Sequence, residues 1–296
     1  MLLASFWLFY ASLGMGAPPP TVHLPPQRIP RVTSPDRFKH RRYDREDISR
    51  LYFFPRRTAA LAKTRTGSPV PLALQDHTRL GAFWSRPHPH APTILYLYGN
   101  GETVTDQLGH WPQWAERAGA NMFFVDYPGF GTSDGKPSLR GAAQAAEAAL
   151  DYLLSRPPAE VPSVVVMGRS AGSLFALHAA QRKDPRIRGV ILESAVADVK
   201  QRFEFRLGDH PDREKILDEL AEDFDHEAKV KALSVPLLVL HTAKDTVVPS
   251  WHGTQLAKWA GTQPILFPNG DHNNIQQTNQ AEYQRRLGDF IARVAK

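Results

Sequence analysis

Residues 168–172 read Gly-Arg-Ser-Ala-Gly, with Ser170 at the centre. An apolar run at 164–167 precedes the motif, and a helical pattern at 174–181 follows it. A serine between a strand and a helix, with glycine two residues to either side, occupies a sharp turn that lifts its hydroxyl clear of the sheet. The five-residue pattern occurs by chance in unrelated chains, so its meaning depends on what else the sequence supplies. We expect Ser170 to act as a nucleophile.

A serine nucleophile needs a base, and the base needs a group that fixes its tautomer. Asp245 follows the apolar stretch 237–240, and His272 follows the apolar stretch 265–267. Each lies just past the carboxyl end of a predicted strand, where open α/β sheets place their active sites. The order Ser170, Asp245, His272 therefore predicts a catalytic triad, in which His272 takes and returns the proton and Asp245 orients it.

An oxyanion also needs two backbone N–H donors. We expect one from Ala171, directly after the nucleophile. The other is expected from Asn100, in the loop after the predicted strand 93–97. Gly99 and Gly101 on either side of Asn100 let this backbone point N–H groups inward.

The elements that would position these groups are short apolar segments alternating with longer helical patterns, which predict one α/β domain over residues 66–296. Eight strands are expected, at residues 70–74, 78–84, 93–97, 121–125, 163–167, 189–192, 237–240 and 265–267. Long helices are expected at residues 139–154, 171–183, 250–260 and 278–295. The first two strands are joined too tightly for a crossover and should pair antiparallel, whereas the later strands should form a mostly parallel sheet with helices on both faces.

The N-terminal part has a different composition. Residues 1–17 are uncharged and largely apolar, which is typical of a signal peptide or membrane anchor, although the run is too short to span a bilayer. A cytoplasmic protein with an apolar extension is the alternative. Residues 18–65 are rich in Pro and Arg and are expected to form an extended, partly ordered arm.

Charge is concentrated in this arm, since residues 28–65 hold twelve Lys or Arg against four Asp or Glu. Such a segment suits contact with an anionic membrane, and a solvated linker is the alternative. No nucleic-acid-binding motif accompanies the charge, so a nucleic-acid partner is not expected.

An insertion at residues 196–234 interleaves apolar and charged positions, which predicts a short amphipathic lid. Phe203 and Phe224 are the candidate contacts to an acyl chain, and packing of the lid onto the domain is the alternative. A lid this small would leave the pocket open and favour short or medium acyl groups.

Metal and cofactor sites are not expected. The 296 residues include no cysteine, which removes disulfides and thiolate metal sites. His88 and His90 alternate with prolines and have no carboxylate cluster beside them in the sequence. His241 ends a predicted buried strand ahead of the acid, and we expect it to be structural.

From about residue 70 onward the chain resembles the α/β-hydrolases, in the branch near monoacylglycerol lipases, serine aminopeptidase-like proteins and acyl-protein depalmitoylases. Beside the triad pattern, the resemblance rests on Asp-Tyr-Pro-Gly-Phe-Gly-Thr-Ser-Asp-Gly at 126–135 and on Leu-Glu-Ser at 192–194. It implies a serine hydrolase that cleaves carboxylic esters or thioesters of a small or lipid-like substrate through an acyl-enzyme, without a cofactor. Peptidase, amidase or acyltransferase activity on the same triad is an alternative, and so is a non-catalytic binding protein of this fold.

Two positions depart from the pattern of that branch. Tyr98 stands where the branch usually has a histidine whose side chain helps to hold the oxyanion loop, and Thr242 stands where it usually has glycine before the acid. Neither departure removes a reacting group. They bear on the rigidity of the oxyanion loop and on the geometry of the acid loop.

Overall fold

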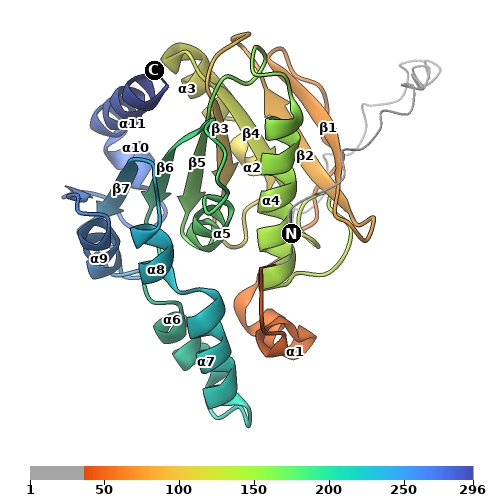
Figure 1. The fold of residues 1–296 in the computed structure, drawn as a ribbon, viewed down its shortest axis with the longest axis vertical. Helices are drawn as coiled ribbons and strands as arrows, with labels where there is room; N and C mark the ends of the chain where they lie inside the picture. The colour runs from red at the N-terminus through yellow and green to blue at the C-terminus, as the bar shows by residue number, and fades with distance from the viewer. Residues whose placement is uncertain (1–36, 296) are drawn as a thin grey trace, which may run out of the picture.

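The computed structural model of the chain describes residues 37–295, which build a sheet of eight strands in the order β1-β2-β4-β3-β5-β6-β7-β8 (Figure 1). The strands are β1 (Gly67–Ala73), β2 (Arg79–Ser85), β3 (Thr93–Leu97), β4 (Asn121–Val125), β5 (Val164–Arg169), β6 (Ile187–Glu193), β7 (Leu237–Thr242) and β8 (Ile265–Phe267). The β1–β2 and β2–β4 pairs are antiparallel, and all other neighbours are parallel. The predicted mostly parallel sheet is confirmed.

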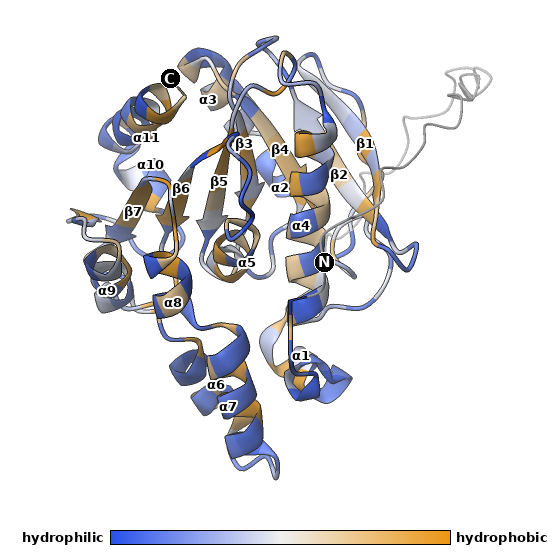
Figure 2. Ribbon diagram, in the orientation of Figure 1, coloured by the Kyte–Doolittle hydropathy of each residue, from blue (hydrophilic) through white to orange (hydrophobic). Residues whose placement is uncertain are grey.

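Helices cover both faces of the sheet. On one face, α4 (Leu139–Ser155) and α5 (Gly172–Ala179) pack against each other. On the other, Trp111 of α3 (Trp111–Ala118) meets Tyr283 of α11 (Gln280–Val294), with ring centroids 6.4 Å apart. The remaining helices are η1 (Arg42–Asp44), α1 (Glu46–Tyr52), α2 (Val104–Gln107), α6 (Val199–Leu207), α7 (Arg213–Asp223), α8 (His226–Lys231), α9 (Trp251–Trp259) and α10 (Ile275–Thr278). Apolar residues line the central strands, and polar residues face outward on the helices (Figure 2).

Local sequence explains these elements. Every residue of β5 is buried, and its Val-rich composition suits a strand covered on both faces. Helix α4 begins where the Ser138 hydroxyl accepts a hydrogen bond from the Gly141 N–H at 3.0 Å, and its many alanines allow close packing on the sheet. The short helices α2, α3 and α10 were not predicted, because four to eight residues are too few to show a helical period.

Part of the arm, residues 42–52, is helical and the residues after it run without helix. It forms η1 and α1 because Tyr43, Ile48 and Tyr52 are buried against the domain. The Tyr43 hydroxyl donates a hydrogen bond to Asp223 Oδ2 of α7 at 2.7 Å. These apolar anchors are few, and the surrounding Pro and Arg residues obscure them in the sequence.

The expected signal peptide or anchor at residues 1–17 and the first half of the arm lie outside the described residues. Within residues 37–295, no helix has the length and apolar character needed to cross a membrane.

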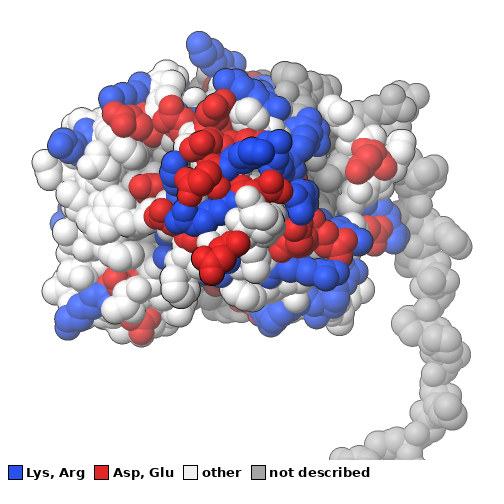
Figure 3. Space-filling view, turned by 90° about the horizontal axis from the view of Figure 1, so that it is seen from below, with Lys and Arg blue, Asp and Glu red and all other residues white. Residues whose placement is uncertain are grey.

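Much of the arm's positive charge is paired within the molecule. Figure 3 shows Lys and Arg interleaved with Asp and Glu on the face seen from below. The ion pairs that join residues 37–65 to the rest of the domain include Arg37–Glu147, Arg42–Glu219, Arg45–Asp212, Arg56–Asp106 and Arg65–Glu116. The arm therefore docks on the domain through charge as well as burial, and its contact with an anionic membrane stays a prediction.

The insertion at 196–234 folds as α6, α7 and α8, with α6 and α7 side by side at the same end of the molecule as α1 (Figure 1). Its last helix is connected to the first residue of the insertion by His226, which is buried. The His226 Nδ1–H donates a hydrogen bond to the carbonyl of Val196 at 2.8 Å. Burial, aided by the charge of Lys229, lowers the pKa of His226 from 6.5 to about 3.

This buried histidine makes the fold sensitive to acid. Between pH 6.5 and about 3 the unfolded chain binds a proton at His226 that the folded chain does not, so the free energy of unfolding falls as the pH falls. We expect His226→Asn, whose amide can still donate to Val196, to flatten the dependence between pH 6 and 4 by up to about 1.4 kcal/mol per pH unit. Urea unfolding at several pH values measures this.

His77→Asn, the same substitution at an exposed histidine, is the matched control. An equally steep loss of stability in the wild type and in His226→Asn would contradict the assignment.

Candidate active site

Ser170 lies on the turn between β5 and α5 with φ at +50°, a conformation in which non-glycine residues are strained. The two glycines of the motif allow this turn. A Cβ at residue 168 would lie 2.6 Å from the Cβ of Ala176, and one at residue 172 would lie 2.0 Å from the carbonyl oxygen of Leu97. Strand β5, helix α5 and strand β3 therefore approach so closely that no side chain fits at residues 168 and 172. Ser170 lies above them and is partly exposed.

The structure brings the three predicted triad residues together. His272 Nε2 lies 2.8 Å from the Ser170 hydroxyl oxygen, and His272 Nδ1 lies 2.7 Å from Asp245 Oδ2. An Nδ1–H that donates to the carboxylate leaves Nε2 free to accept the serine proton. The geometry is that of a nucleophile, a general base and an orienting acid connected in series.

Asp245 is held as an ionised acceptor. The backbone N–H groups of Val247 and Val248 donate to its Oδ1 at 2.9 and 2.8 Å. Burial raises the pKa of Asp245, but the hydrogen bonds from His241 and His272 outweigh burial and hold that pKa well below its usual range. Asp245 therefore stays charged wherever the imidazole needs a counter-charge.

The two loops that carry the acid and the base are tied to each other. His241, predicted to be structural, is fully buried and donates from Nε2 to the carbonyl of Val248 at 2.8 Å. The hydroxyl of Thr242 donates to the carbonyl of Gly270, in the loop before His272, at 3.0 Å. The threonine that departs from the resembled branch thus connects the acid loop to the histidine loop.

The predicted oxyanion donors lie beside the nucleophile. A Cβ at residue 99 would lie 3.3 Å from the Cβ of Ser170, so the loop that carries Asn100 packs against the serine. Among residues 37–295, nothing accepts a hydrogen bond from the backbone N–H of Asn100 or of Ala171. Two unengaged donors at this place are what a developing oxyanion requires.

Tyr98, the other departure, supports this loop in its own way. Its hydroxyl donates to Asp126 Oδ1 at 2.7 Å, and its carbonyl accepts from the Tyr127 hydroxyl at 2.8 Å. Asp126 also accepts from the backbone N–H of Val104 at 2.8 Å. The buried Tyr98–Asp126 pair therefore fixes the start of the loop to the segment after β4.

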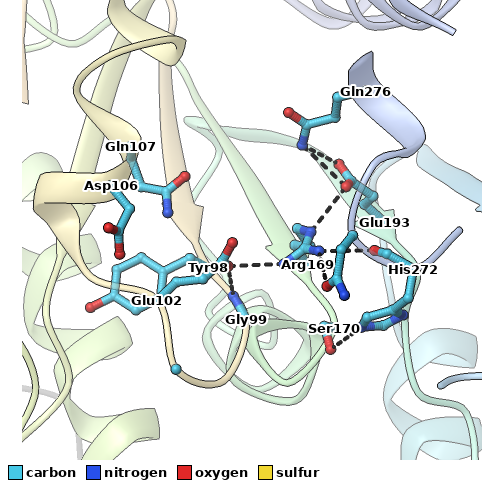
Figure 4. Close-up of polar contacts among 12 residues, drawn as sticks. Tyr98, Gly99, Glu102, Asp106, Gln107, Arg169, Ser170, Glu193, His272 and Gln276 are labelled. Atoms are coloured by element: carbon cyan, nitrogen blue, oxygen red, sulfur yellow. Dashed lines mark hydrogen bonds and ion pairs between the residues drawn. The ribbon is translucent and has the colours of Figure 1, made fainter. Parts of the chain in front are cut away.

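Arg169 is a functional candidate that the sequence did not reveal. Its guanidinium lies between the oxyanion loop and the histidine loop (Figure 4). Nη1 pairs with Glu102 Oε2 at 3.0 Å, and that same oxygen accepts from the Gly99 N–H at 2.7 Å. Nη2 donates to the carbonyl of His272 at 2.9 Å. One buried side chain thus connects the two loops that must face each other across Ser170.

Glu193 is the buried counter-charge of Arg169. Its Oε1 lies 3.3 Å from Arg169 Nε, and Gln276 Nε2 donates to both of its carboxylate oxygens at 3.1 Å. Tyr283 also donates to it. Burial raises the pKa of Glu193, while Arg169 acts in the opposite direction. No local pattern announces this pairing, although Glu193 sits in the tripeptide at 192–194 that carried part of the resemblance.

The two lid phenylalanines are both buried but lie in different surroundings. Phe203 stacks on Tyr52 with ring centroids 4.6 Å apart, and the carbonyl of Tyr52 accepts from the Asn100 side chain. Phe224 packs against Phe38 of the arm, at 5.5 Å. Phe224 thus lies where the arm packs on the lid and Phe203 lies nearer the loop that carries Asn100, and substrate contact by either residue stays a prediction.

The histidines of the 86–90 loop make contacts with the backbone of the domain. His88 Nε2 contacts the carbonyl of Glu116 at 2.6 Å, and His90 contacts that of Ala159. Within the part of the chain that the structure describes, no group of three or more His, Cys, Asp or Glu could hold a metal ion.

Comparison with known sequences agrees with this fold. The model of the serine aminopeptidase S33 family matches residues 89–225. The uncharacterized protein YfhR of Escherichia coli K12 is 30% identical over 234 residues, which cover 75% of this chain and 79% of that protein. The α/β hydrolase domain-containing protein WAV2 of Arabidopsis thaliana is 26% identical over 243 residues, which cover 76% of this chain and 78% of that protein. The chain belongs to the α/β-hydrolase superfamily.

Solved structures share the fold at low sequence identity. The esterase Pf2001 of Pyrococcus furiosus superposes with a TM-score of 0.64 at 17% identity, covering 83% of this chain and 99% of the esterase. Est1E of Butyrivibrio proteoclasticus superposes with a TM-score of 0.64 at 17% identity, covering 77% of this chain and 99% of Est1E.

The Arg169–Glu193 pair yields a stability prediction. Arg169→Met should lower the free energy of unfolding by about 3–5 kcal/mol, because it leaves the Glu193 carboxylate buried without its cation. The double variant Arg169→Met/Glu193→Gln should regain part of that loss, since the remaining amide is neutral. Urea unfolding of the three proteins at pH 7 measures the difference, and a double variant no more stable than the single one would contradict it.

Proposed function

We propose that this protein is a serine hydrolase that cleaves carboxylic esters or thioesters of short to medium acyl groups through an acyl-enzyme. The observation that carries the proposal is the hydrogen-bonded series Asp245, His272, Ser170, with 2.7 and 2.8 Å contacts, next to two unengaged N–H groups. A serine hydroxyl is a poor nucleophile until a base removes its proton, and this arrangement supplies that base in an oriented state.

The proposed reaction proceeds in two halves. The Ser170 oxygen bonds to the substrate carbonyl carbon as its proton passes to His272 Nε2, and the N–H groups of Asn100 and Ala171 hold the resulting oxyanion. The intermediate collapses when the bond to the leaving group breaks, and His272 gives its proton to the departing alcohol or thiol. Water then attacks the acyl-enzyme with His272 again as base, and the carboxylic acid leaves as Ser170 regains its proton.

Ester substrates are supported by the names of structurally similar proteins. Pf2001 is named an esterase, and Est1E has been solved with ferulic acid bound. Peptidase activity is the second candidate, since the matching family model describes serine aminopeptidases. Parallel assays with p-nitrophenyl esters and aminoacyl p-nitroanilides distinguish the two, because the leaving groups differ only at the atom that accepts the proton from His272.

The triad residues should fail in different ways. Ser170→Ala should abolish labelling by a fluorophosphonate, which bonds to the activated serine oxygen. Asp245→Asn should keep the fold but lower kcat by up to about 10⁴, because the amide favours the wrong imidazole tautomer. Labelling assays and ester hydrolysis measure both effects, and His77→Asn, at an exposed histidine outside the triad, serves as the comparison. Near wild-type hydrolysis by His272→Ala would overturn the assignment of the base.

Acyl length should depend on Phe203 and not on Phe224. If Phe203 lines the acyl site, Phe203→Ala should lower kcat/KM for longer p-nitrophenyl esters by about 1–3 kcal/mol while acetate changes little. Phe224→Ala is the matched control, since its loss should reduce stability and affect all chain lengths equally. Equal losses across chain lengths for both variants would assign Phe203 to packing.

A further inference from the structure

The segment 52–57 of the arm crosses the outside of the oxyanion loop, and it lies before the residues matched by the family model. The side chain of Asn100 connects this loop to the arm. Its side-chain Oδ1 accepts from the Phe54 N–H at 3.0 Å, and its Nδ2 donates to the carbonyl of Tyr52. Both ends of the amide are engaged by the arm, while the backbone N–H of the same residue is left for the oxyanion.

The next loop residue is held by the same segment. Arg56 Nε donates to the carbonyl of Gly101 at 2.7 Å, and the Arg56 guanidinium also pairs with Asp106. Gly101 has φ at +84°, and glycine adopts positive and negative φ values about equally well. A glycine-flanked loop has little conformational preference of its own, so its orientation depends on contacts from outside.

The arm is anchored well enough to impose that orientation. Tyr52 stacks on Phe203, and the buried Phe53 meets Phe130 edge to face at 5.9 Å. The carbonyl of Arg56 accepts from the Gly131 N–H at 2.7 Å, which ties the segment to the loop after β4. Side-chain packing and backbone pairing therefore fix residues 52–57 on two sides of the oxyanion loop.

We propose that residues 52–57 are a clamp that positions the oxyanion loop, with Arg56 and the Asn100 side chain as its positioning residues. The inference rests on the proposed hydrolase function and extends it to a part of the chain outside the matched family region. The clamp acts from the surface, whereas Tyr98 at the first loop position directs its hydroxyl inward to Asp126. Without the clamp, the Asn100 N–H would no longer be aimed at the oxyanion.

The experiment compares Arg56→Ala and Asn100→Ala, which keep both backbone N–H groups, with Arg50→Ala. Arg50 is an exposed arginine of α1 that lies outside the segment 52–57 and pairs with Glu46. Because a misplacement of about 1 Å can cost about 10²-fold in rate, we expect kcat for a p-nitrophenyl ester to fall about 10- to 100-fold in the two clamp variants. KM should change little, and Arg50→Ala should match the wild type.

A second measurement separates positioning from general stability. A trifluoromethyl ketone adds the serine oxygen and forms a hemiketal oxyanion, so its affinity reports the oxyanion hole directly. We expect its inhibition constant to rise in Arg56→Ala and Asn100→Ala by the same factor by which kcat/KM falls. Unchanged affinity, or wild-type kcat in both variants, overturns the clamp.

Labelling of the wild type tells this failure from failure of the proposed function. If a fluorophosphonate labels Ser170 of the wild type and the clamp variants behave like the wild type, the hydrolase function is supported and the clamp is overturned. A wild-type protein that is neither labelled nor active on esters or anilides overturns both.

Discussion

The turn between β5 and α5 is the constraint on which the rest of the site depends. Ser170 can stand at φ +50° only because glycine on both sides lets the helix start against the end of β3. That approach brings the loop after β3 next to the serine and leaves the Ala171 N–H at the start of the helix. The position of the Ser170 hydroxyl, the two unengaged N–H groups beside it and the close packing of three elements are therefore consequences of one backbone turn.

The same turn directs Arg169 beneath the site. Arg169 is the last residue of β5 and is buried, so its positive charge needs acidic partners close to it. Arg169 pairs with Glu193 of the neighbouring strand β6 and with Glu102 of the oxyanion loop. The remaining donor reaches the His272 carbonyl. A buried charge without its partners would be destabilising, but with these partners in place Arg169 connects the loop that carries Asn100 to the loop that carries His272.

Around this centre the arm and the lid support each other. Basic side chains of the arm form ion pairs with acidic side chains of α7. The hydroxyl of Tyr43, in the short helix η1 of the arm, donates a hydrogen bond to Asp223. Long-range pairing of this kind orders a segment rich in Pro and Arg that has little intrinsic structure. It also brings residues 52–57, which precede the region matched by the family model, into contact with the loop that carries Asn100.

The sequence by itself determined the strands, the mostly parallel character of the sheet and the places of Ser170, Asp245 and His272, because each depends on a local pattern of residues. An apolar run of strand length, a turn with glycine two residues from serine, and a polar residue just past a strand end can all be read within ten or so residues. Parallel strands then gather their carboxyl ends at one edge, which brings the three residues together.

Only the tertiary structure decided the partners of Arg169, the ordered arm and the separate surroundings of Phe203 and Phe224. Glu102 and Glu193 look like any other acids in the sequence, and Arg56 looks like one of many bases. Which charge meets which depends on how loops far apart in the chain pack, and hydrogen bonds such as those of the Asn100 amide with residues 52–54 leave no periodic trace. The pairing is set by burial, since a buried charge or amide must find its partner wherever the fold has brought one.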